Sequence, residues 1–153
     1  ARSVLRTGDI EAAQEHAMLA RQMAAQATPG AGATLRSTLL IAPHHGSKTS
    51  STQPFLEAVR PVQTVVQVGR RNRYGHPAPV VMARYAALGL PIVSSPACGA
   101  YLWRSDERPS AKAISPHAAT PPWPVLGQCW RTLYPRYGTG VSQEATPWPR
   151  PQG

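Results

Sequence analysis

The 153-residue sequence is poor in several residue types, and each shortage limits what the chain can be. Its two cysteines, Cys98 and Cys129, match neither a metal-binding spacing nor a disulfide framework, so we expect buried or incidental thiols. No apolar run approaches the ~18 residues of a membrane helix, and no signal peptide opens the chain. With a single Phe, the chain can bury a core, but not a large one.

Acidic side chains are scarce as well. The sequence has 7 Asp and Glu against 16 Lys and Arg, a formal net charge of +9, and it has no acidic residue between Ala58 and Ser105, where six Arg occur. Clustered cations gain free energy by releasing counterions from phosphates, which favours a polyanionic partner. Because Arg-rich composition is also common in high-GC bacterial proteins, the charge alone leaves open a chain that binds no nucleic acid.

Strand-like runs alternate with helix-forming segments through residue 104. We expect strands at 3–8, 38–43, 62–68, 91–95 and 99–103, and helices at 10–27, 52–59 and 77–88. Asp9 is placed to cap the first helix, Pro77 to begin the third, and Gly89 to end it. The alternation predicts an α/β fold in which helices cover a sheet.

The last third of the chain has a different composition. Nine of the 17 Pro lie between Ser105 and Gly153, and the apolar residues there follow no sustained period. We therefore expect a folded unit at 1–104 and a Pro-rich, disordered tail at 105–153. The chain starts with Ala1 and enters a strand at once, which suggests a fragment of a longer protein.

Two of the predicted strands end in residues that can bind a metal. The first runs into Gly8-Asp9, and the second runs into Pro43-His44-His45-Gly46. Ligand sites in α/β sheets collect where strands end, so we expect the side chains of Asp9 and His44 to converge. Taken alone, Asp9 is more often a helix cap, and a structural role for the histidines is equally open.

Three motifs, in order, resemble one family. They are Leu5-Arg6-Thr7-Gly8-Asp9, Ile41-Ala42-Pro43-His44-His45-Gly46-Ser47-Lys48-Thr49-Ser50-Ser51 and Gly69-Arg70-Arg71-Asn72-Arg73-Tyr74-Gly75-His76-Pro77. This set resembles the later motifs of the metallo-β-lactamase superfamily, in the form found in ComEC-family DNA-internalisation competence proteins. The resemblance covers Val4 to about Trp103 and implies the C-terminal half of a metallo-β-lactamase (αββα) fold.

The resemblance implies roles for single residues. Asp9 matches a carboxylate that bridges two metal ions, and His44 matches an end ligand of the second metal, with His45 as a neighbour of the ligand or the alternative to it. His76 matches a residue that contacts the scissile phosphate or donates a proton to the leaving oxygen, although a structural histidine is also open. Implied neighbours of the metal or substrate are Ser47, Lys48, Thr49, Ser50, Ser51, Asn72 and Tyr74, and implied DNA-binding cations are Lys48, Arg70, Arg71 and Arg73. For the Ser/Thr loop, residues 47–51, the alternative is a structural one: a turn that caps the next helix.

One departure from the family limits this interpretation. The His-x-His-x-Asp-His loop, which supplies most ligands of the first metal, is absent from the sequence, and so is the single-His motif that follows it. The family implies two divalent ions, Zn²⁺ or Mn²⁺, in the intact domain, whereas this chain has too few ligands to bind them tightly and can lack metal altogether. We expect the chain alone to be inactive or nearly so.

The family also implies a function and its setting. The chain would be part of a bacterial DNA-uptake protein whose intact domain is a metal-dependent phosphodiesterase, a nuclease acting on incoming DNA. A non-catalytic DNA-binding module of the uptake channel is the alternative, and a small-substrate metallo-hydrolase is a further one. The implied partners are single-stranded or double-stranded DNA, the membrane channel of the same parent protein and other competence proteins. The implied location is a soluble domain of an inner-membrane protein in a Gram-negative bacterium.

Overall fold

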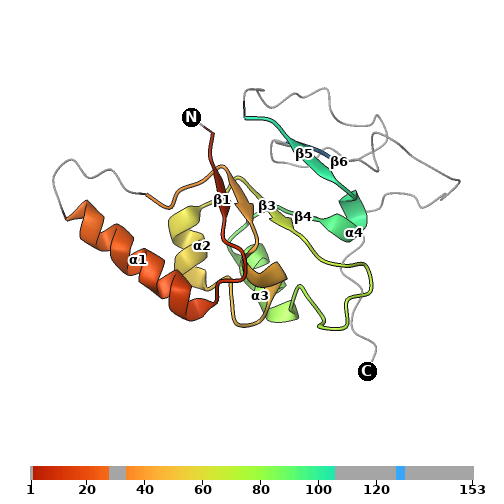
Figure 1. Cartoon of the computed structure of the whole chain (residues 1–153), viewed down its shortest axis with the longest axis horizontal. Helices are drawn as coiled ribbons and strands as arrows, with labels where there is room; N and C mark the ends of the chain where they lie inside the picture. The colour runs from red at the N-terminus through yellow and green to blue at the C-terminus, as the bar shows by residue number, and fades with distance from the viewer. Residues whose placement is uncertain (1, 28–33, 106–126, 130–153) are drawn as a thin grey trace, which may run out of the picture.

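The computed structural model describes residues 2–27, 34–105 and 127–129, which form a mixed α/β structure (Figure 1). The elements are β1 (Val4–Arg6), α1 (Ala12–Gln26), β2 (Leu39–Ile41), the 3₁₀ helix η1 (Pro43–Gly46), α2 (Gln53–Val59), β3 (Gln63–Val66), α3 (Pro79–Ala87), β4 (Ile92–Ser94), α4 (Ser95–Cys98), β5 (Tyr101–Trp103) and β6 (Gly127–Cys129). The predicted α/β class is confirmed. None of the helices in these ranges is both long and apolar enough to cross a membrane.

The first four strands form one parallel sheet in the order β1-β2-β3-β4. Leu5 of β1 is opposite Leu40 of β2, and Leu40 is opposite Thr64 of β3. Sheet order equals chain order, so α1, α2 and α3 each lie in the crossover between two neighbouring strands. Because the strands are parallel, the loops that follow β1, β2 and β3 all leave from the same edge of the sheet.

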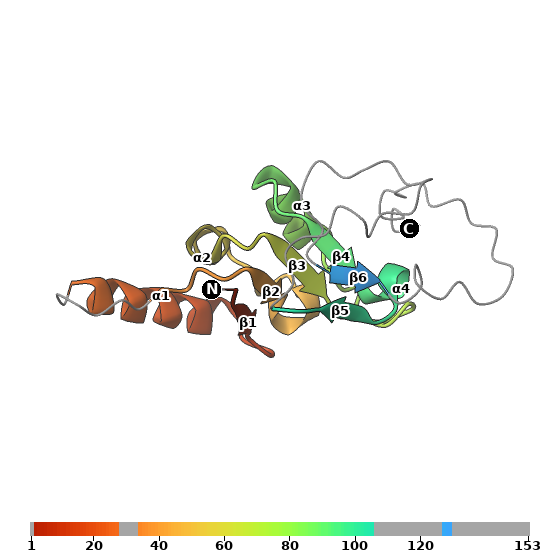
Figure 2. The same cartoon turned by 90° about the horizontal axis from the view of Figure 1, so that it is seen from above.

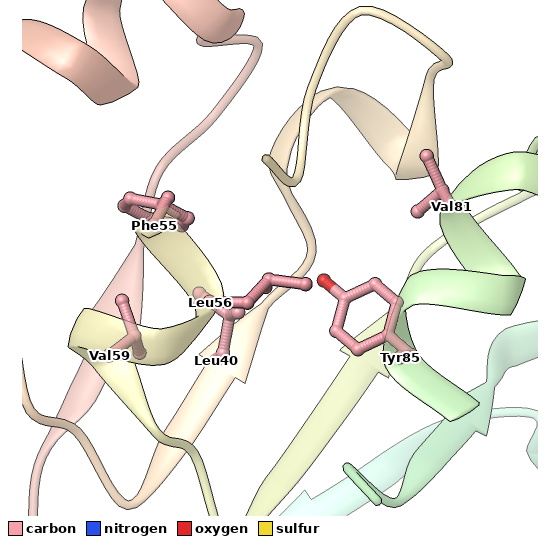
Figure 3. Close-up of a cluster of buried hydrophobic side chains, with 6 residues drawn as sticks. All are labelled: Leu40, Phe55, Leu56, Val59, Val81 and Tyr85. Carbon is pink, nitrogen blue, oxygen red and sulfur yellow. The ribbon is translucent and has the colours of Figure 1, made fainter. Parts of the chain in front are cut away.

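One face of the sheet is covered by helices and contains the core (Figure 3). Leu40 of β2 contributes to a cluster that α2 and α3 complete. The fully buried members are Leu40, Phe55, Leu56, Val59, Val81 and Tyr85. Partly buried Leu5 of β1, Met18 of α1 and Ile92 of β4 pack against this cluster, so every crossover helix buries apolar side chains on the same face. The single Phe, Phe55, is fully buried in this cluster.

The opposite face of the sheet looks toward β5. Alternate sheet residues Val4, Leu39, Ile41, Val65 and Val93 line a cavity of about 590 Å³ there, together with Tyr101, Leu102 and Trp103 of β5. In both views the pair of β5 and β6 lies at the other end of the molecule from α1 (Figures 1 and 2). The two faces are therefore built differently, one closed by helices and one by a two-stranded ribbon.

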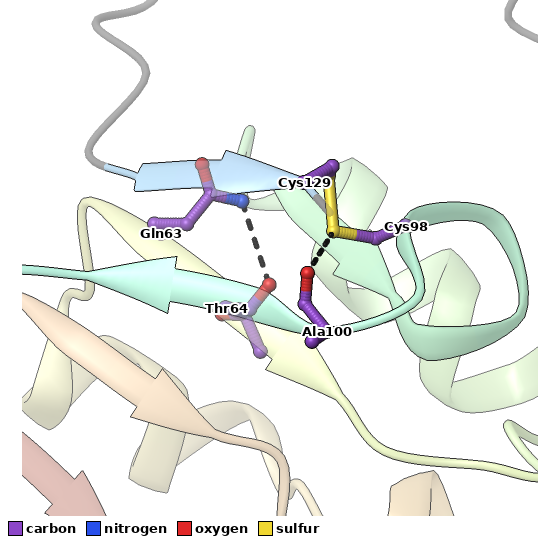
Figure 4. Close-up of a disulfide and its surroundings, with 5 residues drawn as sticks. All are labelled: Gln63, Thr64, Cys98, Ala100 and Cys129. Carbon is purple, nitrogen blue, oxygen red and sulfur yellow. Dashed lines mark hydrogen bonds between the residues drawn. A yellow bond between two sulfur atoms is a disulfide. The ribbon is translucent and has the colours of Figure 1, made fainter. Parts of the chain in front are cut away.

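The two cysteines form a disulfide, Cys98–Cys129, so the expectation of unpaired thiols was wrong (Figure 4). Antiparallel pairing of β5 with β6 places Cys129 opposite Tyr101, close to the end of α4 where Cys98 lies. Sequence spacing carries no information about such pairing. Residues 127–129 belong to the segment predicted as a tail, and they form a strand; the rest of that segment lies outside the described residues, so its prediction stays a prediction.

Two helix starts differ from the expectation. Helix α1 begins at Ala12 with Glu11 as its N-cap, because Gly8 turns the chain at a φ of 61° and leaves Asp9 in the preceding turn. Helix α3 begins at Pro79 rather than Pro77, because Ala78 is extended and donates its N–H to the Gly46 carbonyl at 2.8 Å. The predicted role of Gly89 is confirmed: it follows the last turn of α3 with a φ of 62°.

Glu15 of α1 is a fully buried carboxylate that binds the backbone just before α2. Its two oxygens accept the N–H groups of Ser51 at 2.6 Å and Thr52 at 2.8 Å. From α3, the Arg84 guanidinium donates to the carbonyls of Ser50 at 3.0 Å and Ser51 at 3.2 Å. The loop between η1 and α2 is thus held by two side chains of opposite charge, Glu15 from α1 and Arg84 from α3.

We expect Glu15→Ala to lower the free energy of unfolding by about 2–4 kcal/mol, because two buried N–H groups lose their charged acceptor. The matched control is Glu57→Ala on α2, an exposed glutamate whose loss we expect to change stability by about 0.5 kcal/mol or less. Urea unfolding of both variants measures the difference, and equal losses would contradict the role given to Glu15.

Candidate functional site

The loops after β1, β2 and β3 bring five ionisable side chains to the carboxyl edge of the sheet. We call them the strand-end cluster: Asp9, Glu11, His44, His45 and His76. Asp9 and Glu11 follow β1, the two adjacent histidines lie in η1 after β2, and His76 ends the loop after β3. Parallel strand order therefore joins residues that are 67 positions apart, from Asp9 to His76, at one edge.

His44 and His45 both adopt left-handed backbone conformations, with φ of 46° and 56°. For residues other than glycine this conformation costs roughly 1–2 kcal/mol each, so surrounding contacts must hold it. One of them is the hydrogen bond from the His44 N–H to the Gly8 carbonyl at 2.9 Å, which ties η1 to the turn after β1. Backbone strain of this kind is concentrated at functional sites, which makes η1 the first place to look for one.

Each histidine of η1 faces a different carboxylate. Asp9 Oδ1 lies 3.6 Å from Nε2 of His45, and Glu11 Oε1 lies 3.2 Å from Nδ1 of His44. Asp9 and His44 thus occupy adjacent strand ends, but the side chain that approaches Asp9 belongs to His45. The carboxylate that approaches His44 comes from Glu11, a residue outside the three sequence motifs.

His45 is further fixed through its other ring nitrogen. Nδ1 lies 2.7 Å from the carbonyl oxygen of Gln67, just beyond β3. A carbonyl only accepts, so this contact requires a proton on Nδ1, while Nε2 faces the carboxylate of Asp9, a second acceptor. A histidine held by a backbone carbonyl in this way is oriented like those that bind metals or accept protons.

His76 completes the cluster from the third loop. Its ring centroid is 6.0 Å from that of His44 and 6.0 Å from that of Tyr74, on which it stacks at 19°. Burial lowers the pKa of His76 below its ordinary value of 6.5, and the neighbouring His44 and then His45 lower it further. The neutral ring is therefore the favoured form of His76 near neutral pH.

Asn72 braces the loop that carries His76. Its amide nitrogen donates to the carbonyls of Gly69 at 3.2 Å and His76 at 2.7 Å, and its amide oxygen accepts the His76 N–H at 2.8 Å. The next residue, Pro77, packs on η1 so closely that a Cβ at Gly46 would lie 2.7 Å from the Pro77 Cβ. The Asn-x-Tyr-Gly-His-Pro and His-His-Gly motifs are thus in direct contact, and Asn72 shapes the loop from within.

The Ser/Thr loop after η1 is mostly turned inward. Ser47, Ser50 and Ser51 are buried, and the Ser50 hydroxyl donates to the carbonyls of Pro43 and Ser47 at 2.9 and 3.0 Å. Lys48 and Thr49 are exposed, and Thr49 donates its hydroxyl hydrogen to Glu11 at 2.9 Å. Among the hydroxyls of this loop, that of Thr49 contacts the strand-end cluster.

The cations near the cluster come from two loops. Lys48, Arg70 and Arg71 are exposed, and Arg73 lies 5.0 Å over the Tyr74 ring and donates to its hydroxyl at 2.8 Å. The other arginines of the acid-free stretch are placed differently: Arg84 is engaged with the Ser/Thr loop, Arg60 ends α2 before β3, and Arg104 follows β5. The basic stretch seen in the sequence is therefore a local loop, residues 69–76, rather than a continuous track.

The strand-end cluster does not by itself fit a metal centre. Within residues 2–27, 34–105 and 127–129, no three His, Cys, Asp or Glu side chains are grouped as metal ligands would be. Each carboxylate of the cluster faces its own histidine: Glu11 faces His44, and Asp9 faces His45. The implied roles of Asp9 as a bridge and His44 as an end ligand remain predictions about an intact domain.

We expect the pKa of His76 to lie below 6.5, and His44→Ala to raise it only part of the way back, because burial is the larger cause. The unfolded chain then binds this proton more readily, so His76 makes the fold lose stability as the pH falls through 6.5 and below. An NMR titration of the imidazole resonances measures the pKa. His16→Ala, at an exposed position on α1, is the control and should leave it unchanged; a pKa of 6.5 or more for His76 would contradict the account.

The comparisons with known proteins find three relatives of part of the chain. It is 34% identical over 98 residues to Competence protein ComA of Neisseria gonorrhoeae, and this stretch is 64% of this chain and 13% of that protein. It is 35% identical over 94 residues to the uncharacterized protein YcaI of Escherichia coli K12, covering 61% and 11%. It is 24% identical over 82 residues to ComE operon protein 3 of Bacillus subtilis 168, covering 54% and 11%.

The matched stretch is a small part of each relative, between 11% and 13% of its length. No family model matches the chain, and no solved structure matches it. The metallo-β-lactamase resemblance of the motifs therefore has no structural counterpart here. What the comparisons show is that part of this chain is similar to a stretch of a protein named as a competence protein and of a protein of the ComE operon.

Proposed function

We propose that this chain is part of a protein of bacterial DNA uptake, and that the carboxyl edge of its sheet contacts the DNA backbone. The observation that carries the proposal is the placement of exposed Lys48, Arg70 and Arg71 beside the strand-end cluster, on loops that the parallel sheet brings together. The names of two relatives, a competence protein and a protein of the ComE operon, supply the biological setting.

Charge balance on this edge favours an anionic ligand. The two carboxylates of the strand-end cluster each face a histidine, whereas Lys48, Arg70 and Arg71 have no ion-pair partner among the described residues. Cations without such partners attract phosphates whatever the base sequence, because the free energy of binding comes from the release of counterions. We therefore expect binding without sequence preference.

The aromatic side chain of the basic loop adds a reason to prefer single strands. Tyr74 is 67% exposed, with the Arg73 guanidinium 5.0 Å from its ring centroid and the His76 ring stacked on it at 19°. Unpaired bases stack on such rings in proteins that bind single-stranded nucleic acid, and the gain does not depend on base identity. Within this proposal, Tyr74 holds a base while the neighbouring arginines hold phosphates.

For the intact domain, phosphodiester hydrolysis is the candidate reaction, with Asp9 and the η1 histidines as part of a metal centre whose other ligands come from outside this chain. A non-catalytic DNA-binding module is the second candidate, because exposed Lys48, Arg70 and Arg71 can hold a DNA backbone without a metal. In either case the partners would be DNA and the channel of an inner-membrane parent protein.

We expect this chain to bind single-stranded DNA weakly and with an affinity that falls as salt rises. Three phosphate contacts predict a slope of about −2 in a plot of log K against log salt, at ~0.7 per phosphate. Arg70→Ala with Arg71→Ala should make the slope shallower by about 1.4 for the same reason. Fluorescence anisotropy with a labelled oligonucleotide measures both quantities.

The control removes the same charge elsewhere: Arg21→Ala with Arg36→Ala, on exposed positions outside the strand-end loops, should leave the slope nearly unchanged. An affinity that does not change with salt would refute the proposed surface. An equal change of the slope in the Arg70/Arg71 and Arg21/Arg36 double variants would refute it as well. A parallel assay with Mn²⁺ should show no cleavage by this chain. A longer chain that includes a His-x-His-x-Asp-His loop decides between the candidates, since cleavage there supports the hydrolase and its absence supports the binding module.

A further inference from the structure

The basic loop between β3 and α3, residues 69–76, is fixed at both of its ends. Before it, Val68 donates its N–H to the Ser95 hydroxyl oxygen at 2.8 Å, and that hydroxyl donates to the Val68 carbonyl at 2.7 Å. After it, the fully buried Pro77 packs on Gly46 of η1. Between these anchors the loop contains neither helix nor strand, so the positions of its arginines depend on contacts within the loop.

The first half of the basic loop is a turn that Asn72 closes. The Asn72 N–H donates to the Gly69 carbonyl at 3.3 Å, which is long for a backbone hydrogen bond. The side-chain amide nitrogen of Asn72 donates to the same carbonyl at 3.2 Å and so reinforces the closure. The two central residues of such a turn form its tip, and here they are Arg70 and Arg71, both exposed.

The second half of the loop is closed by the same side chain. The Asn72 amide oxygen accepts the His76 N–H at 2.8 Å, and the amide nitrogen donates to the His76 carbonyl at 2.7 Å. The Asn72 side chain thus bonds to His76 as a backbone peptide group would, and it leaves Arg73 and Tyr74 exposed between them. Every hydrogen bond that a backbone group of the basic loop forms in the structure involves Asn72.

We propose that Asn72 is a positioning residue for DNA binding, which closes both turns and thereby holds Arg70 and Arg71 in place for phosphates. The proposal rests on the proposed function, because it takes the DNA backbone as the ligand. An arginine on a loose loop loses backbone freedom as well as side-chain freedom when it binds, and that loss weakens the affinity. Both N–H donors of the Asn72 amide are already used within the loop, so Asn72 acts through the arginines and not by donating to a phosphate itself.

The bracing can be measured in the chain without DNA. Asn72 is the only asparagine of the sequence, so labelling with ¹⁵N-asparagine gives one side-chain amide signal pair in an NMR spectrum. We expect its two protons to exchange slowly with solvent, because both are hydrogen-bonded. In Asn72→Ala we expect faster exchange of the His76 amide and nearly the same melting temperature, since the loop lies outside the core. Exchange of the Asn72 amide at the rate of a free asparagine side chain would overturn the proposal.

Binding to a labelled single-stranded oligonucleotide tests the consequence for function. We expect Asn72→Ala to weaken the affinity about 3- to 10-fold. The slope of log K against log salt should stay the same, because every cation remains. In a chain that already carries Arg70→Ala and Arg71→Ala, the further change Asn72→Ala should alter the affinity by less than about 2-fold, since the residues through which Asn72 acts are gone.

The matched control is Gln22→Ala, which removes another side-chain amide that bonds to a loop backbone. Gln22 of α1 accepts the Leu35 N–H at 2.8 Å, ahead of β2, and its loss should leave the DNA affinity unchanged. An Asn72→Ala affinity within about 2-fold of the unchanged chain, or an equal loss with and without the two arginines, would overturn the proposal and leave the proposed function intact. Failure of the unchanged chain to bind DNA would instead remove the proposed function and, with it, the ligand that Asn72 is proposed to serve.

Discussion

The contact on which the site depends is the buried carboxylate of Glu15 against the backbone of the Ser/Thr loop. This loop must leave β2, pass through two histidines with left-handed backbone and enter α2 within a few residues, and no cap from the Thr52 side chain helps it. Glu15 of α1 accepts two N–H groups of the loop, and Arg84 of α3 donates to the loop carbonyls. The helices that build the core thereby also fix the loop that carries function.

From that constraint the arrangement of the edge follows. With the Ser/Thr loop held, Thr49 reaches Glu11, His44 bonds to Gly8, and Gly46 receives Pro77 from the next loop. Three loops are then joined at the end of three parallel strands, and their polar side chains are oriented both by backbone contacts and by one another. Preorganisation of this kind is what a site needs in order to bind a charged ligand without ordering its own side chains first.

Much of the fold could be predicted from sequence because local signals were consistent: apolar runs of strand length, good helix formers in 12–26, and Gly89 at a helix end. The strand-end position of Asp9, His44 and His76 followed from the same signals. The pairing of side chains within the strand-end cluster could not be predicted, because sequence spacing does not indicate that Glu11 rather than Asp9 contacts His44. The disulfide, the burial of Glu15 and the inward turn of Arg84 likewise depend on tertiary contacts between segments distant in the sequence.

The central claim is that the carboxyl edge of the sheet is the surface that meets DNA. Mapping of backbone amide shifts in a ¹⁵N-labelled chain during titration with a single-stranded oligonucleotide tests it most directly. The account predicts that the shifts concentrate at residues 44–49 and 69–76, with small changes at Arg36 and Arg60, which precede β2 and β3 at the opposite edge. Shifts that centre on that opposite edge, or on β5, would contradict it.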